Sequence, residues 1–252
     1  MTYSVIIPIV FVAGLLGGTL SWLIRRAVGL DVLRRHHEVG SAVFQQLGVV
    51  FAVLLAFVFN QVWSEYNAVA EAIQQECASL HAVGMMAESL PDAARRRIDA
   101  TIEAYGRAVV AEEWPAMQRN ERSLAAAGRL VQVWRMVVQE TRAEADSSVQ
   151  GQMLTMLSHA YQMRETRLVE ATSDVPVLLW VVLLTLAVAM TSSMFSFGIE
   201  YLWSQIGFTA VFIGCIVFSL LLVYALDQPF QGAVSISPAG FERLVDTMIA
   251  PD

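Results

Sequence analysis

The sequence predicts an all-α membrane protein in which two transmembrane hairpins flank a helical soluble insert. Three observations predict this class. Hydrophobic residues make up 56% of the chain and charged residues only 15%, against about 25% charged in an ordinary soluble domain. The charges are absent from four long runs of sequence. Between the second and third run lies a polar stretch whose apolar residues recur at helical spacing.

Each uncharged run is long enough to cross a bilayer. The runs contain 24 to 26 residues, and a spanning helix needs about 20. The links within each pair of runs are short, which predicts two antiparallel hairpins. The first run has no basic residue ahead of it, unlike a signal peptide, so we interpret it as a retained helix. Its Gly14 and Gly18 permit close helix packing. The four runs are Met1–Ile24, Val39–Ser64, Val175–Ile199 and Tyr201–Leu226.

These runs predict four regions of the chain. Residues 1–64 form the first transmembrane hairpin and residues 175–226 the second. Residues 65–174 form a soluble four-helix insert with 11 Arg and 16 Asp or Glu, a net charge of −5. Residues 227–252 form a tail that begins with a turn.

The first helix of the insert continues the second span. No Gly or Pro interrupts Asn60–Leu80, so one long helix is expected to leave the membrane unbroken. It should end near Leu90, because Pro91 follows. A second helix is expected to end around Glu113–Pro115. Adjacent Glu112 and Glu113 are the residue types of an acid/base pair, but neighbouring helical side chains diverge, which favours a helix end anchored by Trp114.

Composition and motifs exclude several function classes. The net charge is −7 and all 16 basic residues are Arg, which argues against nucleic-acid binding. We find no catalytic motif, so we expect no enzyme, no catalytic residue and no cofactor. Cys77 and His81 have the i, i+4 spacing of metal ligands, but zinc sites need three or four. We therefore expect no metal.

The second span offers a candidate pore. Gly48, Phe51, Leu55 and Phe59 fall on one helical face. In an oligomer, Phe51, Leu55 and Phe59 would form a constriction that gates by dewetting, with Gly48, Asn60 and Glu65 at its mouths. From the pattern alone, a lipid-facing or helix-packing face is the more common explanation.

Arginine placement predicts the orientation. Short Arg-rich loops stay in the cytoplasm, and residues 25–38 contain Arg25, Arg26, Arg34 and Arg35. The opposite side has only Arg164, Arg167 and Arg243 near span ends. The insert is therefore expected outside the cytoplasm.

Several short motifs together resemble a bacterial family of bestrophin-like membrane proteins of unknown function. The similarity runs from about residue 30 to 250, and the tail motif is its most specific part. The motifs are His37-Glu38-Val39, Leu54-Leu55-Ala56-Phe57, Glu113-Trp114-Pro115, and Asp227, Pro229, Phe230 and Gly232 followed by Ser237-Pro238 and Phe241.

The resemblance implies a relation to bestrophins, which are pentameric ion channels with two membrane hairpins around a helical insert. It implies a bacterial inner-membrane location and a pore lined by the second span. The acidic calcium clasp of animal bestrophins is missing after Phe230, which argues against a calcium gate of that type. Bestrophins keep the insert in the cytoplasm, contrary to the orientation that the arginines predict.

The sequence thus predicts a homo-oligomer, with a pentamer as the best stoichiometry, that sits in the lipid bilayer and conducts inorganic ions. The tail turn is expected to be structural; the alternative is that it lines a pore mouth or holds an ion near Asp227. The alternative for the whole protein is a membrane-anchored sensor or interaction module that acts through the insert.

Overall fold

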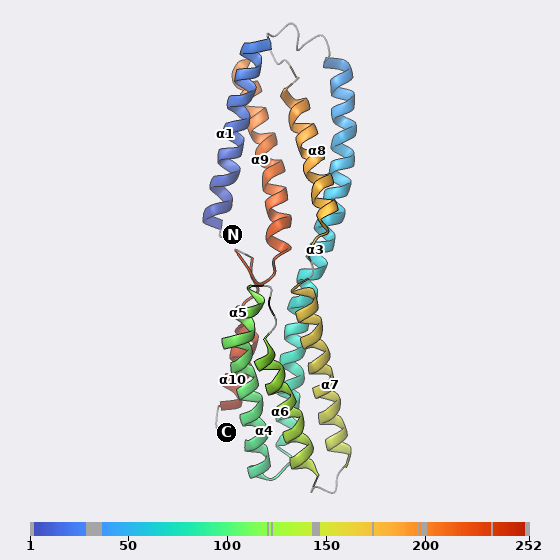
Figure 1. The fold of residues 1–252 in the computed structure, drawn as a ribbon, viewed down its shortest axis with the longest axis vertical. Coiled ribbons are helices and arrows are strands. Elements are labelled where there is room, and N and C mark those ends of the chain that lie inside the picture. The colour runs from blue at the N-terminus through green and yellow to red at the C-terminus, as the bar shows by residue number, and fades with distance from the viewer. Residues whose placement is uncertain are drawn as a thin grey trace. The chain divides into compact units, whose positions relative to one another are not determined.

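The computed structural model confirms the all-α class (Figure 1). It describes residues 3–28, 37–119, 121, 123–142, 147–172, 174–195, 197, 201–232 and 234–249. Arg34, Arg35 and His36 of the predicted cytoplasmic loop lie outside the described residues. The described residues contain four helices long and apolar enough to cross a membrane.

The chain divides into two compact units. The membrane unit consists of Met1–Ser64, Asp174–Gln228 and Gly232–Val234, and the polar unit of Glu65–Ser173, Pro229–Gln231 and Ser235–Asp252. Helix α3 (His37–Ala87) contributes its first part to the membrane unit and its second part to the polar unit. It ends three residues before the expected end near Leu90.

The membrane unit contains α1 (Tyr3–Val28), the first part of α3, α8 (Val177–Phe195) and α9 (Leu202–Leu226). Of its helix pairs within the described residues, α1 and α9 have the most extensive contact. A Cβ atom added to Gly14 would lie 3.0 Å from the Ala210 carbonyl oxygen, and one added to Gly18 would lie 3.0 Å from Ile206. Small residues on α1 therefore allow this approach, as the Gly14–Gly18 pair predicts.

The polar unit contains the second part of α3, α4 (Asp92–Ala108), the π-helical segment η1 (Val109–Glu113), α5 (Trp114–Met117), α6 (Leu124–Thr141), α7 (Ser147–Glu170) and α10 (Ala239–Ile249). Helix α10 packs against α4. Its Phe241 and Leu244 are buried in a core shared with Ile98, Tyr105 and Leu157. The core forms because each helix presents an apolar face at 3–4 spacing.

One expected helix end is wrong. The sequence predicts that the helix from Pro91 ends around Glu113–Pro115, but η1 carries it into α5, which extends to Met117. Pro115 stands in the first turn of α5, directly after the π-helical segment η1.

Candidate functional site

The predicted constriction residues differ in how far their own subunit covers them. Phe51 is 6% exposed, Leu55 is half-buried and Phe59 is 36% exposed. The Phe59 ring stacks on Trp63 with 6.4 Å between ring centroids. Phe51 is thus packed within the subunit, whereas Phe59 leaves the most surface open to a neighbour or to lipid.

The predicted mouth residues lie at the ends of the same segment. Gly48 is half-buried, and a Cβ atom there would lie 3.6 Å from the Met190 methyl group. Asn60 is exposed and Glu65 is half-buried. Gly48 therefore faces α8, and Asn60 presents its amide at the subunit surface.

The span residues of α3 are the least covered of the four membrane helices. Only 11% of the most apolar window of α3 is buried, against 28%, 17% and 22% for α1, α8 and α9. Exposed apolar side chains around this part of α3 include Val49, Val53 and Phe57. A large apolar surface of α3 is therefore available for lipid or for other copies of the chain.

Asp227 ties together the ends of two spans. It follows the last residue of α9, and its Oδ1 accepts a hydrogen bond of 2.9 Å from the backbone N–H of Val175, which precedes α8. Its side chain is buried. The carboxylate thus satisfies a backbone donor at the start of the third span.

The rest of the tail turn packs by backbone and aromatic contacts. The Pro229 carbonyl accepts a hydrogen bond of 2.8 Å from Ile236 N–H. The Phe230 ring meets Trp114 edge to face, with centroids 5.2 Å apart. Gly232 has φ of 86°, in the left-handed region that glycine favours. The Trp114 and Phe230 motifs, 116 positions apart in the chain, therefore meet in the polar-unit core.

A buried charge network joins α3, η1 and α7 in the polar unit. Arg167 donates to Glu76 from Nε at 3.0 Å and to Glu113 from Nη2 at 2.7 Å. Arg164 donates to the other Glu113 oxygen at 2.6 Å. The Tyr105 hydroxyl donates to Glu76. Two arginines thus face two glutamates, so the network is neutral when all four are ionised.

The environment fixes the protonation of the donors. Burial acts to lower the pKa of Arg167, but the charges of Glu76 and Glu113 and the hydrogen bond to Glu76 outweigh it, so this pKa is raised. Burial and the nearby Glu76 raise the pKa of Tyr105 well above its usual range. Arg167 stays charged and Tyr105 stays a hydrogen-bond donor near neutral pH.

The sequence interpretation missed this network, although one signal points to it. Glu76 lies between Ile73 and Leu80 on the apolar face of its helix, where a charge needs a buried partner. The predicted Glu112–Glu113 pair is divided by the structure: Glu112 is exposed and Glu113 is buried with its arginines. The pair does not converge on one site.

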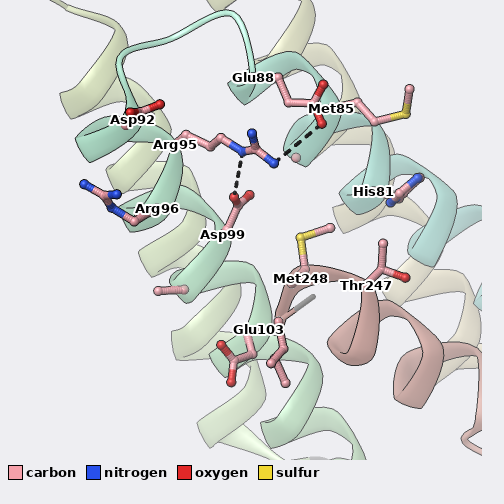
Figure 2. A pocket seen from close by; sticks show the side chains of 13 residues that line it. His81, Met85, Glu88, Asp92, Arg95, Arg96, Asp99, Glu103, Thr247 and Met248 are labelled. Atoms are coloured by element: carbon pink, nitrogen blue, oxygen red, sulfur yellow. Dashed lines mark ion pairs between the residues drawn. The ribbon is translucent and has the colours of Figure 1, made fainter. Parts of the chain in front are cut away.

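A cavity of about 660 Å³ opens in the polar unit between the end of α3, α4 and α10 (Figure 2). Arg95 faces Glu88 at 3.7 Å and Asp99 at 3.6 Å. Burial raises the pKa of Asp99. His81, one of the paired Cys77–His81 positions, also lines this cavity. The described residues contain no group of three or more potential metal ligands.

These features define a multi-pass, all-α membrane protein with a polar helical unit. The sequence matches the model of the Bestrophin-like domain over residues 10–241. The chain therefore belongs to the bestrophin-like family, which confirms the resemblance that its motifs show. No curated protein matches the chain.

Solved structures share the fold. A single-residue variant of a bacterial bestrophin homologue from Klebsiella pneumoniae superposes with a TM-score of 0.76 at 14% identity, covering 96% of this chain and 97% of that one. A zinc-phased structure of the Klebsiella homologue gives 0.74 at 15% identity, covering 96% and 97%. A membrane-protein variant gives 0.76 at 16% identity, covering 95% and 97%. At these identities the likeness shows the fold alone.

Proposed function

We propose that this chain assembles as a homo-oligomer in the bacterial inner membrane and conducts inorganic ions along an axis lined by α3. The supporting observation is the sparse cover of α3: its apolar window is 11% buried in a subunit. A ring of subunits, with five as the working number, would bury that surface between copies. No charge interrupts residues 39–64, which suits a hydrophobic gate.

In this proposal, Phe51, Leu55 and Phe59 form the constriction, with Gly48, Asn60 and Glu65 at its mouths. The exposed Phe59 contributes most to the lumen, and Phe51 supports the wall from within the subunit. The insert carries a net charge of −5, which favours cations if it surrounds the path. We keep the insert on the extracytoplasmic side, as the arginine distribution favours.

Ion flux into liposomes that contain the purified oligomer tests the proposal. Phe59→Ala widens and wets the constriction, so flux is expected to rise. Phe218→Ala is the matched control, because Phe218 is an exposed phenylalanine of α9 outside the proposed wall. The absence of flux from an intact oligomer, with Phe51→Ala and Phe59→Ala equally silent, contradicts the proposal.

A second candidate is a membrane-anchored sensor or interaction module. The polar-unit cavity supports it, since about 660 Å³ is the size of a small-molecule site. A sensor or interaction module does not have to assemble as a ring around an axis lined by α3. Native mass spectrometry separates the two, because a monomer or dimer favours the sensor and a larger ring favours the channel.

A further inference from the structure

An apolar groove of about 430 Å³ opens between α1 and α9 in the membrane unit. This volume is within the range of small-ligand sites, about 300–1,000 Å³. Every residue that lines the groove is uncharged, so a ligand that fills it must be apolar. Its walls include Phe11, Gly14 and Leu15 of α1 and Ala210, Gly214 and Phe218 of α9.

The groove is open to the surroundings of the subunit. Phe11 is 67% exposed on one wall, and Val211 is 66% exposed on the other. Both residues belong to spans that are uncharged over their apolar length. The described part of the subunit therefore leaves the groove uncovered at a depth where the surrounding solvent is lipid.

The groove face of α1 continues along the helix to a cation. At 3.6 residues per turn, Phe11, Leu15, Trp22 and Arg26 fall within about 60° of one another around the helix axis. All four side chains are exposed. The guanidinium carbon of Arg26 lies 5.5 Å from the centroid of the Trp22 ring, which keeps the charge on this face. An apolar path thus leads from the groove to one positive charge.

Two tryptophans mark the membrane interface at the Arg26 end of this path. The contacts of Gly14 and Gly18 with α9 show that α1 and α9 run antiparallel, in a register that brings Trp203 to the level of Trp22. Trp203 is 82% exposed. Tryptophan is enriched where the hydrocarbon core meets the headgroups. Arg26, one turn further along α1, therefore lies at headgroup depth.

The length of the path matches one leaflet. Leu15 and Arg26 are eleven residues apart, which is about 17 Å along a helix at 1.5 Å per residue. One leaflet contributes about half of a hydrocarbon core of about 30 Å. The groove therefore lies at the depth that an acyl chain reaches when its headgroup is beside Arg26.

We propose that one anionic phospholipid binds along this face, with its phosphate at Arg26 and an acyl chain in the α1–α9 groove. The guanidinium donates charge-assisted hydrogen bonds to the phosphate oxygens, and the apolar walls take the chain. A free phosphate would make only the first of these contacts. The site does not use the proposed assembly around α3, and it does not depend on conduction.

Native mass spectrometry of the purified full chain, titrated with lipid, tests the site. Phosphatidylglycerol is compared with phosphatidylcholine that carries the same acyl chains. One arginine at the headgroup is expected to give phosphatidylglycerol about a fivefold preference. Arg26→Gln is expected to abolish this preference. Arg129→Gln, which changes an exposed arginine of the polar unit, should keep it.

A second pair of variants tests the groove. Val211→Trp places an indole in the groove and is expected to weaken both lipids by about tenfold, the value of about two buried methylene groups. Val188→Trp is the matched control, because Val188 is 65% exposed on α8 and does not line the groove. It should leave both affinities unchanged.

Three outcomes overturn the proposal. The first is equal affinity of the unmodified chain for the two lipids, and the second is a fivefold preference that survives in Arg26→Gln. The third is loss of an oligomer in Val211→Trp but not in Val188→Trp, which would make a second copy of the chain the occupant of the groove. The titration measures bound lipid and not ion flux, so failure of the channel proposal leaves it interpretable.

Discussion

The two units bury polar groups in opposite ways. In the polar unit, the buried glutamates and arginines are joined in one network in which each charged group has an opposite partner. In the membrane unit, the buried side chains of Ser21, Gln205 and Thr209 are neutral, and each leaves an atom without a hydrogen-bond partner among the described residues. The buried charges of the polar unit therefore neutralise one another within the subunit, whereas the buried polar atoms between α1 and α9 do not satisfy one another.

The largest effect is expected from breaking the polar-unit network. Arg167→Met leaves Glu76 and Glu113 buried with only Arg164 to offset them. Removing one member of a buried ion pair costs about 3–5 kcal/mol. The free energy of unfolding by denaturant, followed by circular dichroism, measures the loss.

The control for this change is Arg97→Met. Arg97 pairs with Glu140 at 2.7 Å but is 58% exposed, and exposed pairs contribute about 0–1 kcal/mol. Equal small losses in both variants would show that the buried network adds nothing to stability beyond a surface pair.

An intermediate effect is expected from Tyr105→Phe. It removes the hydrogen bond to Glu76, and bonds to charged groups contribute about 1.5–3 kcal/mol. The pKa of Tyr105 is raised in the folded chain, so above the unfolded tyrosine pKa of about 10 the folded state holds a proton that the unfolded state has lost. Stability therefore falls as pH rises past about 10.

Unfolding midpoints between pH 7 and pH 11 check this dependence. Tyr105→Phe should lose part of the alkaline decline, and the exposed Tyr161 provides the control as Tyr161→Phe. Parallel pH curves for all three proteins would contradict the assignment.

The smallest effect is expected at the α1–α9 contact. A Cβ atom at Gly14 would lie 3.0 Å from the Ala210 carbonyl oxygen, which is backbone and cannot rotate away. Gly14→Ala is therefore expected to destabilise the protein by about 1–3 kcal/mol. Gly207→Ala, where nothing lies within 4 Å of the new Cβ atom, should be neutral or stabilising by up to about 1 kcal/mol. A reversed order in thermal unfolding would show that α1 and α9 pack differently.

The fold class could be predicted because a run of some 25 uncharged residues can be recognised from contiguous sequence, without knowledge of tertiary contacts. The four apolar helices and the bestrophin-like family are confirmed. The unbroken α3 also followed from local evidence, since no Gly or Pro interrupts Asn60–Leu80.

The partners of buried groups were not predictable in the same way. The Glu113 carboxylate lies in the π-helical turn η1, and its partners Arg164 and Arg167 are 51 and 54 residues further along the chain. Sequence spacing cannot reveal such a pairing. The sequence also cannot show which face of α3 points toward the neighbouring helices, because residues 39–64 are uncharged on every side and have no polar face to orient them. The pore residues therefore remain a prediction.

The 91 residues that separate Glu76 from Arg167 have a consequence for biosynthesis. At about 5–20 residues per second, the ribosome adds Arg167 roughly 5–20 s after Glu76. During that interval, α3 carries a carboxylate on its apolar face without its guanidinium. The core of the polar unit needs α7 for Arg167 and α10 for Phe241 and Leu244, so it can close only after α8 (Val177–Phe195) and α9 have been made. A nascent chain that stalls earlier would expose Glu76 and its apolar neighbours to chaperones and proteases.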